Sequence, residues 1–304
     1  MAHAKLIIDT DPGQDIDDLL ALTFALRRPE LDIKAITTVT WPADKRARLV
    51  NRLLRHHDRT DIPVAAGADF PLHALTDAGM AARCDFPRVM NHYAFAEPED
   101  PRDAPADTDA ADLIIRTIEQ HPHAIVLACI APLTNIARAL QRRPEIAGKV
   151  RQIIMMGGET ALDRVEHNVS SDYTAADIVL SSGIPIVMGT WDVTRRFTLS
   201  KEDCALFRGH PSPLCRALGR AIDLWQPAQS WKPGPVMYDL FPMVHAFDQS
   251  YYNIRPSPVR VVTAAGDNRG RTIIDDAGQM LEVTTDINAA AIRSLYLATV
   301  LGEG

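Results

Sequence analysis

Short apolar runs alternate with amphipathic segments along the first two thirds of the chain. The apolar runs, rich in Ile and Val and typical of buried strands, are residues 6–8, 33–39, 62–67, 124–129, 150–156 and 185–188. The segments with apolar positions at helical spacing are residues 19–26, 43–57, 112–120, 133–140 and 173–182. This alternation predicts an α/β fold with an open, mostly parallel sheet and helices on both faces.

The last third of the chain departs from this alternation. Residues 200–228 predict helix, and residues 259–263 and 271–274 predict a small C-terminal β hairpin. A further strand is expected at 280–284, and Asp286 is expected to cap a final helix.

Two segments lack periodicity. Residues 68–108 are rich in Pro, Asp, Ala and Glu, and a span of this length inside a compact domain usually forms a lid or an insertion. Pro227, Pro233 and Pro235 interrupt the second segment, so a mobile loop is expected around 225–236. No domain linker separates these parts, and residues 1–304 are expected to form a single domain.

Five aspartates lie between the first predicted strand and the first predicted helix: Asp9, Asp11, Asp15, Asp17 and Asp18. In open α/β sheets, ligands bind at the carboxyl ends of strands. Adjacent carboxylates repel one another unless a cation neutralises them, and oxygen-only ligands favour Ca²⁺ or Mg²⁺. A structural alternative is that Asp15 caps the helix while Asp17 and Asp18 complement its dipole.

Composition excludes several other classes of function. The net charge is −7, and the short basic run at 45–48 is expected to be a solvated helix face, so a nucleic-acid partner is not expected. No apolar run reaches the roughly 20 residues that cross a bilayer, and the first residues lack the pattern of a signal sequence. The four scattered cysteines predict free thiols. We therefore expect a cytoplasmic protein without a membrane partner.

The acidic stretch and several later segments resemble the nucleoside hydrolases, the inosine-uridine-preferring family of calcium-dependent N-ribohydrolases. The matching segments, in chain order, are Asp9-x-Asp11-Pro12-Gly13, Asp17-Asp18, Thr37-Thr38-Val39, Ala131-Pro132-Leu133-Thr134-Asn135, Met156-Gly157-Gly158, Glu166-His167-Asn168 with Asp172, Asp192-Val193-Thr194, Tyr238-Asp239 and Arg269-Gly270-x-Thr272. The resemblance implies the Rossmann-like nucleoside hydrolase fold, a small-molecule nucleoside or ribosyl substrate, and a homodimer or homotetramer.

The resemblance also implies a calcium site. Asp11, Asp18 and Asp239 match the family's carboxylate ligands, and Ile130 matches the position whose backbone carbonyl is a further ligand. Such a site leaves positions open for two ribose hydroxyls and one water.

The remaining roles follow from the same resemblance. Asp17 matches the general base, Glu166 and Asn168 match the residues that hold the ribose 5′-hydroxyl, and Met156 matches a residue that lines the sugar pocket. The implied reaction is hydrolysis of an N-glycosidic bond by a calcium-activated water, with inversion at the anomeric carbon.

The chain departs from the family pattern at three places. The acidic loop is two residues longer than usual, so either Asp17 or Asp15 is the base, and we favour Asp17 because the following Leu-Leu-Ala-Leu fixes the helix register. Pro42 stands where an Asn usually reaches the ribose, and Trp41 beside it is a candidate for stacking on the base or sugar. Tyr238 replaces the usual His that protonates the leaving base, and a phenol is a weaker acid than imidazolium.

Alternatives therefore stay open. Tyr238, His73, His92 or a stacked Trp231 are candidates for activating the leaving group, although Trp225 and Trp231 are expected mainly to pack. The protein is alternatively a non-catalytic binder of a ribosyl ligand, or a hydrolase of a different glycosyl compound on the same fold. A phosphatase with Asp9 as its nucleophile is a third, weaker hypothesis.

Overall fold

The computed structural model describes residues 3–302 and contains one nine-stranded sheet with the strand order β3-β2-β1-β4-β5-β6-β9-β7-β8. Its strands are β1 (Ala4–Thr10), β2 (Leu31–Thr38), β3 (Val64–Ala66), β4 (Ile125–Cys129), β5 (Gln152–Met156), β6 (Ile186–Gly189), β7 (Tyr252–Val261), β8 (Thr272–Ile274) and β9 (Gln279–Ile287). Strands β1 to β6 pair in parallel, which confirms the predicted fold class.

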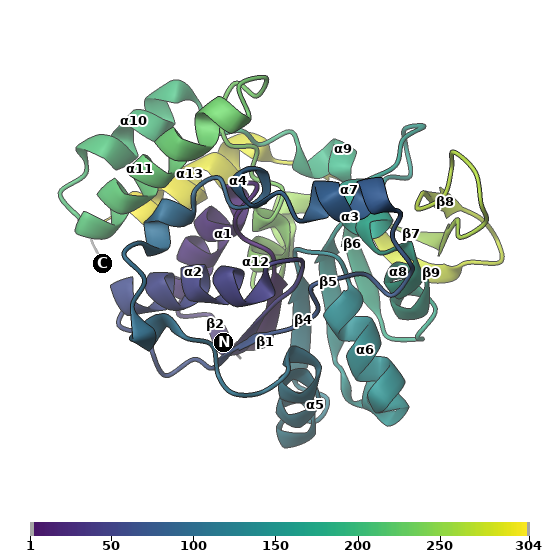
Figure 1. Cartoon of the computed structure of the whole chain (residues 1–304). Helices are drawn as coiled ribbons and strands as arrows, with labels where there is room; N and C mark the ends of the chain where they lie inside the picture. Colours follow the sequence, from purple (N-terminus) through teal and green to yellow (C-terminus); the bar gives the residue numbers. More distant parts are fainter. Residues whose placement is uncertain (1–2, 303–304) are drawn as a thin grey trace.

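Helices cover both faces of this sheet (Figure 1). The α-helices are α1 (Asp17–Leu26), α2 (Ala43–His56), α3 (Asp77–Arg83), α4 (Phe86–Val89), α5 (Ala110–Gln120), α6 (Thr134–Arg142), α7 (His167–Ser171), α8 (Tyr173–Leu180), α9 (Trp191–Thr194), α10 (Lys201–Gly209), α11 (Pro213–Ala228), α12 (Leu240–His245) and α13 (Ala289–Leu301). The 3₁₀ turns are η1 (Tyr93–Ala96), η2 (Pro101–Asp103), η3 (Pro144–Lys149) and η4 (Gln249–Tyr251). Helices α1, α2, α12 and α13 pack on one face, and α5, α6 and α8 pack on the other.

The core consists mainly of two apolar layers, one on each face of the sheet. Successive side chains of a strand point to opposite faces, and β1 shows the consequence: Leu6 and Ile8 join the layer under α1, whereas Ile7 joins the layer under α5 and α6. All three side chains are fully buried. A strand buried on both faces explains why this stretch of the sequence is a continuous apolar run.

The strand order creates a crevice beside β1. The chain runs from β1 outward to β2 and β3, and then returns to place β4 on the other side of β1. Ligands bind at such a switch point in open α/β sheets. Asp11 follows the end of β1, and Ile130 follows the end of β4, so both residues reach the same edge of the sheet.

The C-terminal strands extend the main sheet. The predicted hairpin is present, since β7 and β8 pair antiparallel, but β9 also pairs in parallel with β6. The expectation that Asp286 caps the last helix was wrong. Strand β9 continues to Ile287 because it pairs with β7 as far as Tyr252, and the Asn288 side chain instead accepts the Ala291 N–H at 3.2 Å.

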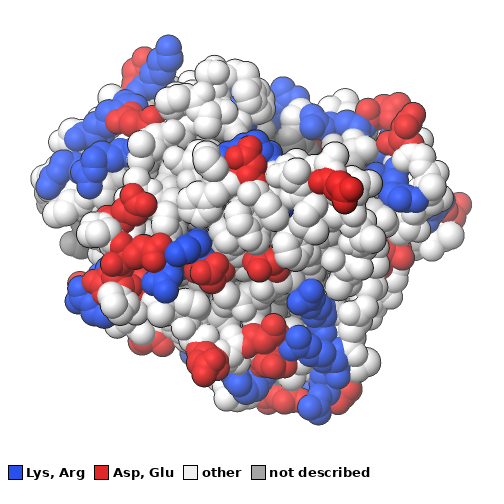
Figure 2. All heavy atoms as spheres, in the orientation of Figure 1, with Lys and Arg blue, Asp and Glu red and all other residues white. Residues whose placement is uncertain are grey.

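The segments expected to be irregular contain regular pieces. Residues 68–108 include α3, α4, η1 and η2, and α11 runs through Pro227 before it ends at Ala228. Lysine, arginine and acidic side chains are interspersed on the face that Figure 2 shows. Within residues 3–302, no helix is both long and apolar enough to cross a bilayer.

Candidate active site

A cavity of about 240 Å³ lies at the carboxyl ends of β1, β4 and β5. Every predicted site residue except Trp41 lines it: Asp11, Asp17, Asp18, Ile130, Met156, Glu166, Asn168, Tyr238 and Asp239. Pockets for drug-sized ligands usually measure roughly 300–1,000 Å³. A slightly smaller cavity lined by carboxylates suits a small polar ligand.

Three carboxylates form the floor of this cavity. Asp17, Asp18 and Asp239 are buried, and one oxygen of each lies within 4.8 Å of the others. Burial, followed by repulsion from neighbouring aspartates, raises the pKa of Asp17 and Asp239 well above the usual range. Burial also raises the pKa of Asp18 to about 6. This arrangement is costly unless a cation binds there.

Local hydrogen bonds position the carboxylates. Asp18 Oδ1 accepts the Thr10 hydroxyl at 2.5 Å and the Asp11 backbone N–H at 3.0 Å, which fastens the start of α1 to the end of β1. Asp17 Oδ2 accepts the Asp239 backbone N–H at 3.4 Å. Asp11 lines the same cavity, and its pKa is raised by burial and by the charge of Asp18.

Asp9 supports the acidic loop from behind. Its Oδ1 accepts the Thr37 hydroxyl at 2.6 Å and the Asn135 amide at 2.8 Å, and Asn135 also donates to the Thr38 carbonyl at 3.0 Å. These contacts give the matched Thr37-Thr38 and Asn135 segments a structural role. Asp9 is 1% exposed and does not line the cavity, so it is not accessible as the nucleophile of the phosphatase hypothesis.

A buried cation lies under the acidic loop. Arg46 belongs to the run expected to be a solvated helix face, and that expectation was wrong because the residue is 1% exposed. Its guanidinium donates to the carbonyls of Asp11, Pro12, Thr40 and Trp41, which satisfy it away from water. Arg46 therefore holds the loop that contains Pro42 against the loop that contains Asp11.

Two predicted roles do not match the positions of their residues. Trp41 lies outside the cavity lining and packs edge-to-face on Phe86, with ring centroids 6.2 Å apart. Asp15 does not cap α1, because the N-cap is Ile16 and it lacks a side-chain cap. Instead, Asp15 lines the cavity and forms an ion pair with Lys232.

Backbone amides hold the opposite wall. Glu166 caps α7, where its carboxylate accepts the N–H groups of Asn168, Val169 and Gly158 at 2.8 to 3.0 Å. Asn168 donates from its side-chain amide to the Met156 carbonyl at 3.1 Å. Their predicted contacts with a ribose 5′-hydroxyl and with the sugar stay predictions, and all three side chains face the cavity.

The candidates for leaving-group activation differ in position. Burial, followed by the charge of Asp17, raises the pKa of Tyr238 to about 12, which makes this phenol a weak proton donor. His92 is fully buried, and burial lowers its pKa to about 3, while His73 stacks on Tyr173 with centroids 4.2 Å apart. Trp231 lines the cavity and is 74% exposed.

The expectation that Trp225 and Trp231 mainly pack was right for one of the two residues. Trp225 packs in the core as predicted, whereas the exposed Trp231 does not. Sequence reasoning also missed several residues that line the cavity: Gln14, His167, Trp191, Gln229 and Lys232. His167 lies inside the matched segment Glu166-His167-Asn168, and this position could have identified it as a site residue. Lys232 had no comparable signal.

Comparison with known proteins agrees with this geometry. The family model "Inosine-uridine preferring nucleoside hydrolase" matches residues 6–294. The pyrimidine-specific ribonucleoside hydrolase RihA of Citrobacter koseri is 31% identical over 280 residues, which cover 89% of this chain and 88% of the relative. RihA of Escherichia coli O9:H4 is 35% identical over 226 residues, covering 72% of this chain and 70% of the relative.

Solved structures show the same similarity. The plant nucleoside hydrolase PpNRh1 superposes with a TM-score of 0.84 at 25% identity and 99% coverage of both chains. The purine-preferring ribonucleoside hydrolase from Gardnerella vaginalis gives 0.84 at 25% identity and 98% coverage of both chains. The chain therefore belongs to the inosine-uridine preferring nucleoside hydrolase family and is a ribonucleoside hydrolase, an enzyme that cleaves an N-glycosidic bond.

Proposed function

We propose that this enzyme hydrolyses a ribonucleoside with the help of Ca²⁺, held by Asp11, Asp18, Asp239 and the Ile130 carbonyl. The observation that carries the proposal is the floor of the cavity, where buried carboxylate oxygens of Asp17, Asp18 and Asp239 lie within 4.8 Å of one another. An oxygen-only donor set with several carboxylates suits a hard divalent cation. The fit is also electrostatic, since a cation removes the repulsion that raises the pKa values of these groups.

When bound, Ca²⁺ would hold the two vicinal ribose hydroxyls and increase the acidity of a water. Asp17, a member of the same cluster, accepts a proton from the attacking water as the new bond forms to the anomeric carbon. The neighbouring carboxylates stabilise the positive charge that develops on the ribose ring. Direct attack by water predicts inversion at that carbon.

Glu166 and Asn168 hold the ribose 5′-hydroxyl in this proposal. The Glu166 carboxylate is fixed by three backbone amides, so it presents its one remaining acceptor position without reorganisation. Met156 forms the apolar wall against the sugar. The base extends from the anomeric carbon toward the end of the cavity that contains Tyr238, Trp231 and Lys232.

The base that this enzyme prefers belongs to the proposal as well. The RihA relatives are named as pyrimidine-specific and the Gardnerella enzyme as purine-preferring. We propose a ribonucleoside of either class as the substrate and, from the family resemblance, a homodimer or homotetramer as the assembly. Tyr238 and Pro42, which depart from the family pattern, make other ribosyl compounds worth including in an assay.

A calcium-dependent assay tests the proposal. Protein treated with a chelator and dialysed is expected to release no ribose from a panel of purine and pyrimidine nucleosides, and added Ca²⁺ is expected to restore release. Asp18→Asn is expected to lose both Ca²⁺ binding in calorimetry and ribose release, whereas Asp107→Asn, at an exposed position, keeps both. Full activity of the chelated protein, or unchanged Ca²⁺ affinity in Asp18→Asn, would contradict the proposal.

A further inference from the structure

Lys232 is a buried cation at the base end of the cavity. The residue is 6% exposed, although lysine is seldom buried without a partner. Its Nζ forms an ion pair with Asp15 and lies 5.1 Å from the centre of the Trp231 ring, 5.8 Å from that of Trp225 and 5.4 Å from that of Tyr238. The ammonium is therefore enclosed by one carboxylate and three aromatic faces, contacts that attract a cation.

This ammonium has more N–H donors than hydrogen-bond partners among the residues described. It carries three N–H groups, and the part of the chain that the structure describes supplies one hydrogen bond, to Asp15 Oδ2. Because Lys232 lines the cavity, the other two N–H groups are available to a ligand. Lys232 is also close enough to Asp17 for its positive charge to lower the pKa of that carboxyl.

A departing nucleobase needs such a donor. When the N-glycosidic bond breaks, its electron pair stays on the base nitrogen, and the base becomes an anion unless a group stabilises or protonates it. The Tyr238 phenol is uncharged and, with its pKa of about 12, a weak acid. His92 and His73 lie outside the cavity lining. A full positive charge with free N–H groups is better suited to this role.

We propose that Lys232 is the group that activates the leaving base, by donating a proton from its ammonium to the base as the N-glycosidic bond breaks. The inference rests on the proposed function. Water supplies a hydroxyl to the anomeric carbon and a proton to Asp17, while the base leaves with the bonding electron pair and the proton from Lys232. Transfer of the proton from Asp17 back to Lys232 through solvent restores both groups, so the net reaction consumes one water.

The Asp15 contact fits this role. Asp15 belongs to the acidic loop and Lys232 follows α11, so the ion pair fastens these two segments together. The Asp15 carboxylate fixes the position of the ammonium between turnovers. Asp15 is thus a positioning residue that acts through Lys232.

A comparison of two leaving groups tests the inference. Lys232→Gln is assayed with the best nucleoside substrate and with p-nitrophenyl β-D-ribofuranoside, whose phenolate leaves without protonation. We expect kcat on the nucleoside to fall about 10²-fold or more, and kcat on the aryl riboside to change by less than about threefold. Lys232→Arg keeps the charge and the hydrogen-bond donors, but arginine is not deprotonated in proteins, so this variant is expected to stay about as impaired on the nucleoside as Lys232→Gln, and full recovery would overturn proton donation.

Other outcomes have separate meanings. Equal losses on both substrates would overturn the inference and show that Lys232 only supports the site through Asp15. Full activity of Lys232→Gln on nucleosides would overturn it as well. If the enzyme does not accept the aryl riboside, uridines with increasingly electron-withdrawing 5-substituents replace it, and the dependence of kcat on base acidity must steepen in Lys232→Gln.

The control variant is Lys201→Gln, an exposed lysine at the start of α10, which should match the unmodified enzyme on every substrate. If the unmodified enzyme releases ribose from no substrate in the presence of Ca²⁺, the proposed function itself fails, and this result is distinct from a failure of Lys232 alone.

Discussion

Two of the places where the molecule buries aspartates differ in how the negative charge is compensated. At the floor of the cavity, Asp17, Asp18 and Asp239 lie close together and share no arginine or lysine ion pair among the residues described. Beside α2, Asp103 is 1% exposed and forms ion pairs with both Arg52 and Arg55 at 2.8 Å. Among the residues described, the first cluster has no ion-pair partner, whereas Asp103 has two.

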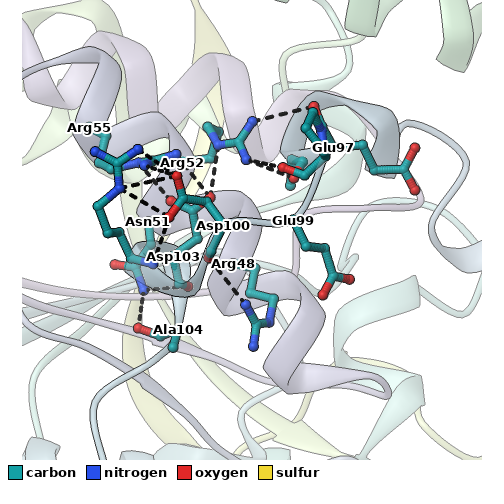
Figure 3. Close-up of polar contacts among 12 residues, drawn as sticks. Arg48, Asn51, Arg52, Arg55, Glu97, Glu99, Asp100, Asp103 and Ala104 are labelled. Carbon is teal, nitrogen blue, oxygen red and sulfur yellow. Dashed lines mark hydrogen bonds and ion pairs between the residues drawn. The ribbon is translucent and has the colours of Figure 1, made fainter.

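Figure 3 shows the compensated cluster. Arg52 and Arg55 point from α2 toward Asp103, and Arg55 also donates to Asp100 at 2.8 Å. Arg52 binds the Ala96 and Pro98 carbonyls at 2.9 and 2.7 Å as well. The cluster thereby fastens η1 and η2, within residues 68–108, to α2.

The difference separates a structural cluster from a functional one. Both contain buried carboxylates, so burial alone does not identify a site. The cavity floor differs because its acids repel one another, have raised pKa values and face an open volume. In the proposed function a cation from solution completes the cavity floor, whereas arginines of the chain itself complete the cluster beside α2.

The largest expected effect is at the cavity floor, with Asp17→Asn. Loss of the proposed base should lower kcat by about 10²- to 10⁴-fold, because the amide accepts no proton from the attacking water. Asp15→Asn tests the alternative base and should cost less, since Asp15 acts through Lys232. Steady-state ribose release with several nucleosides measures kcat for both variants. A larger loss in Asp15→Asn than in Asp17→Asn would identify Asp15 as the base. Thermal unfolding of each variant serves as the control for folding.

In the cluster beside α2, Asp103→Ala should lower stability rather than activity. Removing the shared carboxylate leaves two arginines with side chains 13% and 20% exposed, so they regain water only in part. We expect the free energy of unfolding to fall by about 2–3 kcal/mol, with kcat per folded molecule unchanged. Denaturant titration measures the first quantity, and Asp107→Ala in the same segment is the exposed control. A loss of kcat without a loss of stability would contradict this division.

Local patterns in the sequence account for much of the fold and of the acidic floor. The strand and helix periods predicted β1 to β6 and their helices, and the position of Asp11, Asp17 and Asp18 at a strand end predicted a site there. The grouping of these aspartates is a property of adjacent residues in the chain, so it can be read directly from the sequence.

Features that depend on distant partners escaped prediction. Arg46 is buried only because carbonyls of two other loops satisfy it, and Lys232 only because Asp15, 217 positions away, faces it. Strand β9 extends beyond its expected end because β7 pairs with it. As a result, the cap of the last helix is Asn288 rather than Asp286. Amphipathic periods and motifs carry no information about such long-range contacts.

The smallest expected effect concerns the cavity mouth. Trp231 keeps 74% of its surface exposed, and stacking on the base would cover part of it. A base stacked on an aromatic side chain gains about 1–3 kcal/mol, and exposure places this residue at the low end, so Trp231→Ala should raise KM by about 3- to 10-fold. The change in kcat should stay within about twofold, because the acidic floor and Lys232 are intact. Leu224→Ala, on α11 and 45% exposed but outside the cavity lining, is the matched control. An unchanged KM for every nucleoside would show that the base does not reach Trp231. Base binding would then not depend on stacking on this exposed side chain.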